Sequence, residues 1–266
     1  MKNKLLLFML VLVLGILAAC GAGEEKSTGT ETEGTEDKKV LVMGTSADYP
    51  PFEYVDTANG EEIIGFDIDV AKAIGEKLGY EIIVENMDFN SLIPAIEAGK
   101  FDFVIAGMSA TPEREKVVDF TVPYYETQQV VLTMKDSGIE SEEDLAGKTV
   151  GAQVSSIQLD YANEVAELIE GVKVESRDAV PQAIQELVNG RFAGVFIEDI
   201  VAENYVASND KFTYFPVTIV GENEDKSIVL PKGSELKAEF DKAIQELAED
   251  GTLDALKEKW FVVTAE

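Results

Sequence analysis

The segment Gly99-Lys100-Phe101-Asp102-Phe103-Val104-Ile105 recurs in outline as Gly190-Arg191-Phe192-Ala193-Gly194-Val195-Phe196. Each copy follows a stretch with apolar residues three apart, which is the spacing of one face of a helix. These apolar residues are Ile93 and Ile96 before the first copy, and Ile184 and Leu187 before the second. The repeat is short, but it is supported by the order of the surrounding elements, which also restarts. It predicts two lobes of one design.

Short β runs alternate with amphipathic helices around each copy. In the first half we expect strands at 40–43, 82–84 and 101–106, and helices at 67–78 and 92–98. The second half restarts with a capped turn at 141–145, strands at 148–152, 172–175 and 192–197, and helices at 157–169 and 179–188. Such alternation predicts an α/β fold in which each lobe is a mostly parallel sheet flanked by helices.

Two connections are predicted to join the lobes. Residues 128–134 are rich in β-formers and can cross from the first lobe to the second, and a return crossing falls near 217–227. Helices at 235–248 and 253–260 would then pack back on the first lobe. We therefore expect lobe 1 to contain residues 40–127 and 221–266, lobe 2 to contain 128–220, and two hinge strands to frame a cleft.

The N-terminus has the pattern of a secretory signal. Lys2 and Lys4 precede an apolar run from Leu5 to Leu17, which is shorter than the roughly 20 residues that span a bilayer. We expect residues 1–19 to be a signal peptide, and Leu17-Ala18-Ala19-Cys20 resembles the bacterial lipobox, in which the cysteine carries lipid. Residues 20–39 would then be the lipidated Cys20 and a flexible polar tether, which places the protein outside the cytoplasm and anchored to the cell membrane.

Charge and composition exclude several classes of function. The 266 residues carry a formal charge of −29, and removal of Lys2 and Lys4 with the signal takes it to −31. This argues against nucleic acid and anionic lipid headgroups as partners. The chain has no His and one Cys, so neither a zinc site nor a His-based nucleophilic triad is expected, and we predict no metal and no cofactor.

The stretch that follows the first copy, Ala106-Gly107-Met108-Ser109-Ala110-Thr111-Pro112-Glu113-Arg114, suits the binding of a carboxylate. The backbone lies bare at Gly107, and Ser109 supplies a hydroxyl. We expect a helix with Thr111 as N-cap and Pro112 as first residue, so that Arg114 reaches back over the strand end. An Arg fork grips a carboxylate through two parallel hydrogen bonds.

Other chemistry-bearing residues also follow predicted strands, where ligands of parallel sheets bind. The turn from Ser46 to Glu53 holds Tyr49, which we expect to face the ligand, while Phe52 is expected in the core. Phe89 is a second ring at the same edge, and two such rings can stack on a flat or cationic side chain.

The second lobe supplies a complementary set. Ser156 is the predicted N-cap of a helix whose free amides and positive dipole end suit an anion. Glu198 follows the strand 192–197 and suits an ammonium group, with Asp199 as the adjacent alternative. A carboxylate receptor beside an ammonium receptor predicts the binding of a zwitterionic α-amino acid.

The chain resembles the extracellular solute-binding proteins of family 3, which serve ABC transporters for polar amino acids. The resemblance covers about Val40 to Trp260. It depends on Pro50-Pro51-Phe52-Glu53, Gly65-Phe66-Asp67-Ile68-Asp69, Leu92-Ile93-Pro94-Ala95, Gly99-Lys100-Phe101-Asp102, Ala106-Gly107-Met108-Ser109, Arg114, Val118-Asp119-Phe120, Pro123-Tyr124-Tyr125, Gly147-Lys148-Thr149-Val150-Gly151, Asp250-Gly251-Thr252-Leu253 and Trp260. It implies a two-lobed fold of the periplasmic-binding-protein type II class that closes on its ligand.

The resemblance also implies roles for individual residues. The α-carboxylate would be held by Arg114, Ser109 and the Ser156–Ile157 amides. The α-ammonium would be held by the Gly107 carbonyl and Glu198. The ligand side chain would lie between Tyr49 and Phe89, flanked by Gln158 and Met108.

Two positions depart from the commonest family pattern. Ser46 stands where many relatives carry Asp, which weakens the case for a lysine-type ligand unless Glu53 and Asp67 supply the negative charge. Glu198 also stands where Asp is usual, and its longer side chain can reposition the α-ammonium. We favour arginine, lysine or another basic amino acid, with glutamine close behind.

We therefore predict a monomeric, non-enzymatic capture protein that passes an amino acid to the transmembrane subunits of an ABC permease. The alternative is an enzyme on the same scaffold, since some relatives are dehydratases of amino-acid precursors and a carboxylate such as Glu198 can act as an acid.

Overall fold

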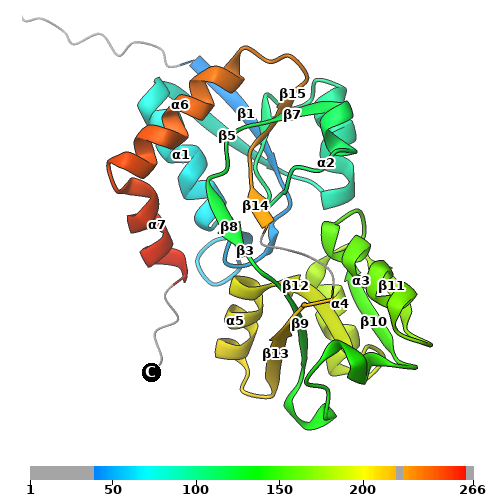
Figure 1. The fold of residues 1–266 in the computed structure, drawn as a ribbon. Coiled ribbons are helices and arrows are strands. Elements are labelled where there is room, and N and C mark those ends of the chain that lie inside the picture. The colour runs from blue at the N-terminus through cyan, green and yellow to red at the C-terminus, as the bar shows by residue number, and fades with distance from the viewer. Residues whose placement is uncertain (1–38, 220–223, 262–266) are drawn as a thin grey trace, which may run out of the picture. The chain divides into compact units, whose positions relative to one another are not determined.

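The computed structural model describes residues 39–219 and 224–261, and residues 38–266 form one compact unit. Within this unit the chain builds two five-stranded sheets, each flanked by helices (Figure 1). The predicted two-lobed α/β fold of type II is confirmed. The predicted signal peptide, Cys20 and all of the tether except Lys39 lie outside the described residues.

The first lobe is built on a sheet with the strand order β5-β1-β6-β15-β7. Strand β1 runs parallel to β5 and β6, whereas β15 is antiparallel to β6 and β7. The strands are β1 (Lys39–Thr45), β5 (Tyr80–Asn86), β6 (Phe103–Val104), β7 (Val118–Phe120) and β15 (Val229–Pro231). The helices are α1 (Phe66–Leu78), α2 (Phe89–Glu97), α6 (Leu236–Glu249) and α7 (Thr252–Phe261).

Helices cover both faces of this sheet. Helices α1, α6 and α7 lie together on one side and α2 on the other (Figure 1). The apolar face of α1 buries Ile68, Ala71 and Ile74, as the spacing predicts, and the helix ends at Gly79 in the left-handed conformation. On the opposite face, Leu92 and Ile96 of α2 are buried. The sheet is therefore fixed between two apolar layers.

The second lobe has the strand order β11-β10-β12-β9-β13. Strand β10 is parallel to β11 and β12, and β9 is antiparallel to β12 and β13. The strands are β9 (Gln129–Met134), β10 (Thr149–Gln153), β11 (Lys173–Arg177), β12 (Gly194–Glu198) and β13 (Phe212–Pro216). The helices are α3 (Ile157–Leu168), α4 (Val180–Val188) and α5 (Asp199–Ser208), with short 3₁₀ turns at Lys135–Ser137 and Glu142–Leu145.

The repeated segments have the same packing role in both lobes. A Cβ atom added to Gly44 of β1 would lie 2.5 Å from the ring of Phe101, and one added to Gly151 of β10 would lie 2.2 Å from the ring of Phe192. Both distances are far below van der Waals contact. In each lobe a Phe from the repeat therefore lies directly on a bare glycine of the second strand of the sheet, β1 or β10.

A two-stranded antiparallel ribbon lies where the chain passes between the lobes. Strand β8 (Tyr125–Thr127) pairs with β14 (Glu224–Lys226), with Tyr125 opposite Lys226. Strand β8 leads into β9 of the second lobe, and β14 leads into β15 of the first (Figure 1). Residues 220–223, which precede β14, are not described.

A small antiparallel sheet forms beside the first lobe and was not predicted. It consists of β2 (Asp48–Tyr49), β3 (Glu53–Asp56) and β4 (Glu62–Ile64), in the order β2-β3-β4. It places the turn after β1, which contains Tyr49 and Glu53, at the mouth of the first sheet.

Two predicted elements differ from the structure. The strand expected at 101–106 is limited to Phe103–Val104, and just before it the side-chain carboxylate of Asp102 accepts the Val42 amide of β1 at 2.7 Å. The helix expected to begin at Pro112 is a 3₁₀ turn, Arg114–Lys116. Its N-cap position is Glu113 and not Thr111, although the Thr111 hydroxyl does accept a hydrogen bond from the Arg114 amide at 3.2 Å.

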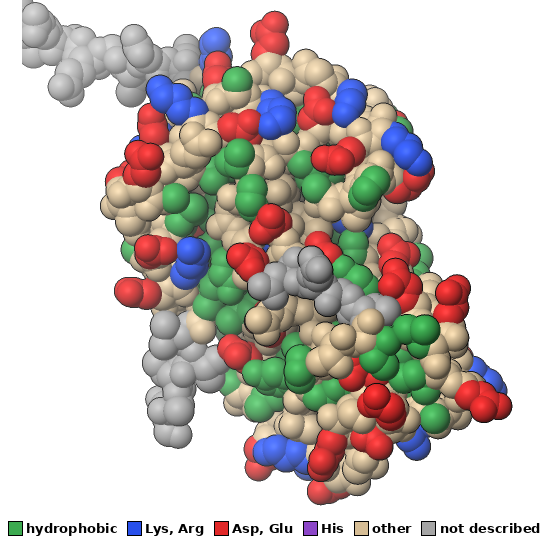
Figure 2. Space-filling view, viewed as in Figure 1, with side chains coloured by type: hydrophobic (Ala, Val, Ile, Leu, Met, Phe, Trp, Pro, Cys, Tyr) green, Lys and Arg blue, Asp and Glu red, His purple; other side chains and the backbone are tan. Residues whose placement is uncertain are grey.

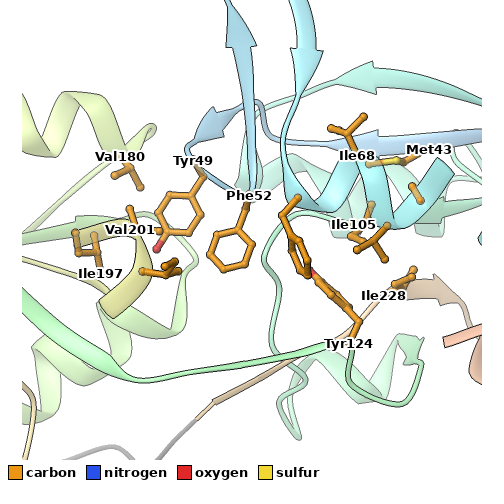
Figure 3. Packing of buried hydrophobic residues seen from close by; sticks show 14 of the residues in the cluster. Met43, Tyr49, Phe52, Ile68, Ile105, Tyr124, Val180, Ile197, Val201 and Ile228 are labelled. Carbon is orange, nitrogen blue, oxygen red and sulfur yellow. The ribbon is translucent and has the colours of Figure 1, made fainter. Parts of the chain in front are cut away.

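One apolar cluster includes residues of both lobes. Figure 3 shows the ring of Tyr49, from the first lobe, among Val180, Ile197 and Val201 of the second. Phe52 is fully buried beside Tyr49, as expected for a core residue, with ring centroids 5.9 Å apart. Acidic side chains are spread over the visible surface of both lobes (Figure 2). Among the described residues, no helix is long and apolar enough to cross a membrane.

Candidate functional site

A cavity lies where the carboxyl ends of β1, β6, β10 and β12 meet. Its lining combines residues of both lobes, which the edge rule for parallel sheets predicts. The lining residues are Ser46, Asp48, Tyr49, Glu53, Phe89, Ala106, Gly107, Gln153, Ser156, Gln158, Val180, Phe196, Ile197 and Glu198.

Arg114 joins the two lobes at this cavity. One terminal nitrogen of its guanidinium donates to the Ser109 carbonyl at 2.6 Å, and the other donates to the Ser155 carbonyl of the second lobe at 2.8 Å. Burial lowers the pKa of the guanidinium to about 10, so it stays protonated at neutral pH. Its carbon lies 5.7 Å from the centre of the Phe89 ring, an arrangement that favours a cation–π contact. The cation is held beside the cavity, and its remaining N–H groups can bind an anion.

The start of α3 lies next to Arg114, because Ser155 immediately precedes the helix N-cap. Ser156 donates its hydroxyl proton to the Gln153 carbonyl and accepts from the Leu159 amide at 3.2 Å, so its side chain serves the cap. The first amides of a helix have no intrahelical partner. The amides of Ile157 and Gln158 therefore give the cavity an electropositive edge close to Arg114.

A chain of hydrogen bonds runs from the second lobe through the ribbon to the first. Gln158 donates its side-chain amide to Gln129 at 3.0 Å and to Glu198 at 2.8 Å. Glu198 forms an ion pair with Lys226 of β14, and Lys226 also donates to the Ser109 hydroxyl at 3.1 Å. Lys226 is fully buried, and it is the only buried Lys or Arg among the described residues.

One carboxylate oxygen of Glu198 has no hydrogen-bond partner among the described residues. Its Oε1 is bound by Gln158 and Lys226, whereas Oε2 is buried and has no partner among the described residues. Burial raises the pKa of Glu198, and the charge of Lys226 acts in the opposite direction. A buried oxygen without a donor is costly, so Oε2 is suited to accept from a group that enters the cavity.

The predicted aromatic residues take different positions. Tyr49 stacks on Phe52, and its hydroxyl accepts from the Glu198 amide of the second lobe at 3.4 Å. Phe89 is the first residue of α2 and is half-buried. Both rings line the cavity, and the Phe89 ring also lies beside the Arg114 guanidinium.

The wall of the cavity formed by the first lobe is acidic. Burial raises the pKa of Asp48 to about 6, although hydrogen bonds from Ser46 and from the Val180 amide oppose the shift. Burial also raises the pKa of Glu53 well above its usual value, and the charge of Asp67 adds to the effect. Asp67 itself lies behind the wall, and burial raises its pKa to about 6.

Some predicted site residues lie outside the cavity lining. Met108 is part of an apolar cluster with Leu92 and Ile96, because the chain turns its side chain into the core of the first lobe. Ile157 is buried without lining the cavity, and the Ser109 hydroxyl is bound to Lys226. Arg114 and Asp67 are not among the lining residues either, but Arg114 contacts the lining residue Phe89 and Asp67 interacts with the lining residue Glu53.

Sequence reasoning missed Asp48, Gln129, Gln153 and Lys226. Lys226 follows Glu224 and Asp225 and has the pattern of a solvated charge. Its position inside the predicted return crossing at 217–227 was the one signal available. Among the described residues, no cluster of His, Cys, Asp or Glu has the geometry of a metal site.

Comparison with known proteins agrees with this architecture. The family model for bacterial extracellular solute-binding proteins, family 3, matches residues 41–263. The arginine-binding extracellular protein ArtP of Bacillus subtilis (strain 168) is 44% identical over 262 residues, which cover 98% of each chain.

Solved structures give the same result. The substrate-binding protein AbpA of Streptococcus pneumoniae, bound to L-arginine, is 34% identical with a TM-score of 0.79 and covers 86% of this chain and 97% of its own. An ancestral arginine-binding protein is 42% identical in a complex with arginine (TM-score 0.77, 84% and 98% covered) and in one with glutamine (TM-score 0.76, 84% and 97% covered).

These relatives are solute-binding proteins and not enzymes, which decides against the dehydratase alternative. Their family is extracellular, in agreement with the predicted location outside the cytoplasm. The chain belongs to the bacterial extracellular solute-binding proteins of family 3 and is the substrate-binding component of an amino-acid ABC transporter.

Proposed function

We propose that this protein captures a basic L-amino acid, arginine in preference to lysine and glutamine, and passes it to an ABC permease. The observation that carries this proposal is the excess of acid at the cavity. Asp48, Glu53 and Glu198 line it, and of these three only Glu198 forms an ion pair with Lys226. A cationic side chain offsets the remaining negative charge, whereas a neutral or acidic one does not.

The α-amino and α-carboxyl groups would bind where opposite charges meet. We assign the α-carboxylate to Arg114 and the first amides of α3, since these are adjacent cationic and electropositive groups. We assign the α-ammonium to the free Oε2 of Glu198 and to the Gly107 carbonyl. Both assignments use groups from two lobes, so hinge closure would complete the site.

The ligand side chain would extend between Tyr49 and Phe89 toward Glu53 and Asp48. A guanidinium stacks on aromatic faces and donates to two carboxyl groups at once. Lysine offers a point charge without the planar stacking surface, and glutamine offers no charge. The arginine bound in AbpA and the arginine and glutamine bound in the ancestral protein support this class of ligand.

We also propose that Cys20 carries the lipid that anchors the protein, and that the protein is a monomer. The lipobox-like Leu17-Ala18-Ala19-Cys20 supports the anchor. In a bacterial host, a Cys20→Ser variant should move from the membrane fraction to the medium or periplasm. Light scattering after size-exclusion chromatography should give the mass of one chain.

A thermal-shift screen against the twenty common amino acids tests the ligand class, because a ligand specific for the folded state raises the melting temperature. We expect the largest shift with arginine, a smaller one with lysine and a smaller one again with glutamine. Calorimetry then gives the affinity and a stoichiometry of one. The proposal would be contradicted if glutamate, aspartate or leucine gave the largest rise in melting temperature. It would also be contradicted if no amino acid changed the melting temperature.

A further inference from the structure

Two carboxyl groups meet inside the first lobe, one at the cavity wall and one behind it. Glu53 is the first residue of β3 and Asp67 is in the first turn of α1. The turn before α1 brings them together: the Asp67 amide donates to the Phe52 carbonyl at 2.9 Å, and Gly65 takes a left-handed φ of 137°. Glu53 is 1% exposed and Asp67 is fully buried.

If both carboxyl groups are ionised, three of their four oxygens lack a hydrogen-bond donor among the described residues. Asp67 Oδ2 accepts from the Gly107 amide at 2.7 Å and from the Tyr124 hydroxyl at 3.0 Å. Asp67 Oδ1 and both oxygens of Glu53 are buried without a donor in the described part of the chain. Two buried carboxylates in contact cannot both hold a charge at low cost. One proton placed between them removes the repulsion and supplies the missing donor.

The surroundings decide which carboxyl group holds the proton. Asp67 has two donors on its Oδ2, which favour its charged form, whereas Glu53 has none. Burial and the charge of Asp67 raise the pKa of Glu53, whereas the hydrogen bonds from Gly107 and Tyr124 act to lower that of Asp67. The other charged or titratable groups that face the pair are Asp48, which disfavours ionisation of Glu53, Lys226, which favours it, and the Tyr124 hydroxyl. Glu53 is therefore the acid and Asp67 the acceptor.

We propose that Glu53 donates a shared proton to Asp67 in the free protein, and that the cationic side chain of a bound amino acid displaces this proton into solvent. Glu53 lines the cavity, so a guanidinium or ammonium group placed there takes over the positive charge that the proton supplied. A neutral amide side chain supplies no such charge, so it leaves the proton in place. This inference depends on the proposed function, because it requires that the cavity bind an amino acid.

The consequence is a ligand affinity that depends on pH and on ligand charge. Because binding of arginine releases a proton, its affinity rises with pH, by at most about tenfold per pH unit. The rise ends once the pair has lost its proton in the free protein. Glutamine binding releases none, so its affinity stays level over the same range. The charge state of Glu53 thus sets the preference between a cationic and a neutral ligand.

Calorimetry in two buffers with different ionisation enthalpies, phosphate and Tris, measures the proton released on binding. With arginine at about pH 7 we expect release of a sizeable fraction of one proton, and with glutamine close to none. Glu53→Gln should abolish the release, weaken arginine binding and remove its pH dependence. Glu62→Gln is the matched control, because Glu62 is exposed on the adjacent strand β4 and undergoes the same replacement of a carboxyl group by an amide.

The proposal is overturned if arginine binds at pH 6 to 8 without proton release. It is also overturned if the Glu53→Gln variant releases as many protons on arginine binding as the wild type and the Asp48→Asn variant releases none, because Asp48 is then the source of the proton. Should Glu53→Gln fail to fold, the two-buffer measurement on the wild type still decides.

The shared proton can also be tested without a ligand. If no amino acid binds, the proposed function fails, and infrared spectroscopy of the free protein then tests the pair alone. A protonated-carboxyl band that is present in the wild type and in Glu62→Gln supports the shared proton, and its absence from the wild type overturns it.

Discussion

Replacing Lys226 with Met should destabilise the protein strongly, although the new side chain has similar length and is apolar. Lys226 and Glu198 form an ion pair whose side chains are 1% and 2% exposed. Removing one partner of a buried pair typically costs about 3–5 kcal/mol, because the other charge is left without compensation. Glu198 keeps the hydrogen bond from Gln158 at 2.8 Å, so we expect the lower end, about 3 kcal/mol at pH 8.

The loss should depend on pH. Burial already raises the pKa of Glu198, and Lys226 opposes the shift. Without Lys226 the folded pKa rises further above the unfolded value, so the folded state binds a proton that the unfolded state has lost. An acid with a raised folded pKa destabilises the fold increasingly as pH rises from the unfolded pKa to the folded one. The deficit of Lys226→Met should therefore be smaller at pH 5 than at pH 8.

Urea unfolding of the wild type and the variant at both pH values measures the difference. Lys257→Met is the control: its ion pair with Asp254 at 3.0 Å is exposed, and its loss should cost less than about 1 kcal/mol. The double variant Lys226→Met/Glu198→Gln should recover part of the stability at pH 8, since no buried charge remains. The reasoning fails if Lys226→Met costs no more than Lys257→Met, or if the double variant is no more stable than Lys226→Met at pH 8.

Three further predictions concern the carboxylate site, the repeated packing pair and the acidic wall. Arg114→Ala should weaken ligand binding by about 2–5 kcal/mol, or tens- to thousands-fold in Kd, and calorimetry with an unchanged affinity would reject the role of Arg114. Gly151→Ala forces a Cβ atom into the Phe192 ring and should cost about 1–3 kcal/mol in urea unfolding, much of it regained in Gly151→Ala/Phe192→Leu. Asp48 has a pKa raised to about 6, so Asp48→Asn should gain stability relative to the wild type as pH rises from about 4 to 6, and a constant difference across pH would contradict this.

The main elements of both sheets could be predicted because their burial follows a simple period. Helix α1 and strands β1 and β10 lie close to the predicted ranges. Helix α5 was not predicted. Its buried residues Ile200, Val201 and Ala202 are consecutive and do not repeat at helical spacing. The helix is fixed by packing against strands β9, β12 and β13, which local sequence does not reveal.

The site was predictable where a charged residue directly follows a strand and hidden where distant chain segments create the contact. Glu198 ends β12, so its location at the edge of the sheet follows from the sequence. Lys226 is buried because β14 pairs with β8, about a hundred residues earlier in the chain, which places its ammonium group beside Glu198. The contact between Glu53 and Asp67 likewise depends on a turn at Gly65 that no periodicity indicates.

The two lobes use the same packing of a Phe on a glycine, but different residues follow their strands. The residues that stabilise the sheets are therefore not the residues proposed to bind the ligand. In both lobes a Phe of the repeat lies on a bare glycine, which fixes strand β1 or β10 without any charged group. The residues beyond the strand ends are therefore free to differ: the first lobe supplies Arg114 and the second supplies Glu198. Each of these charges is held by a contact that reaches beyond its own lobe, Arg114 with the Ser155 carbonyl and Glu198 with Lys226 of the ribbon. In the proposed site each lobe contributes one group to the α-carboxylate and one to the α-ammonium, Arg114 and the Gly107 carbonyl from the first lobe and the α3 amides and Glu198 from the second, so each end of the ligand is fully held only when the lobes approach, and we expect binding to be coupled to that approach.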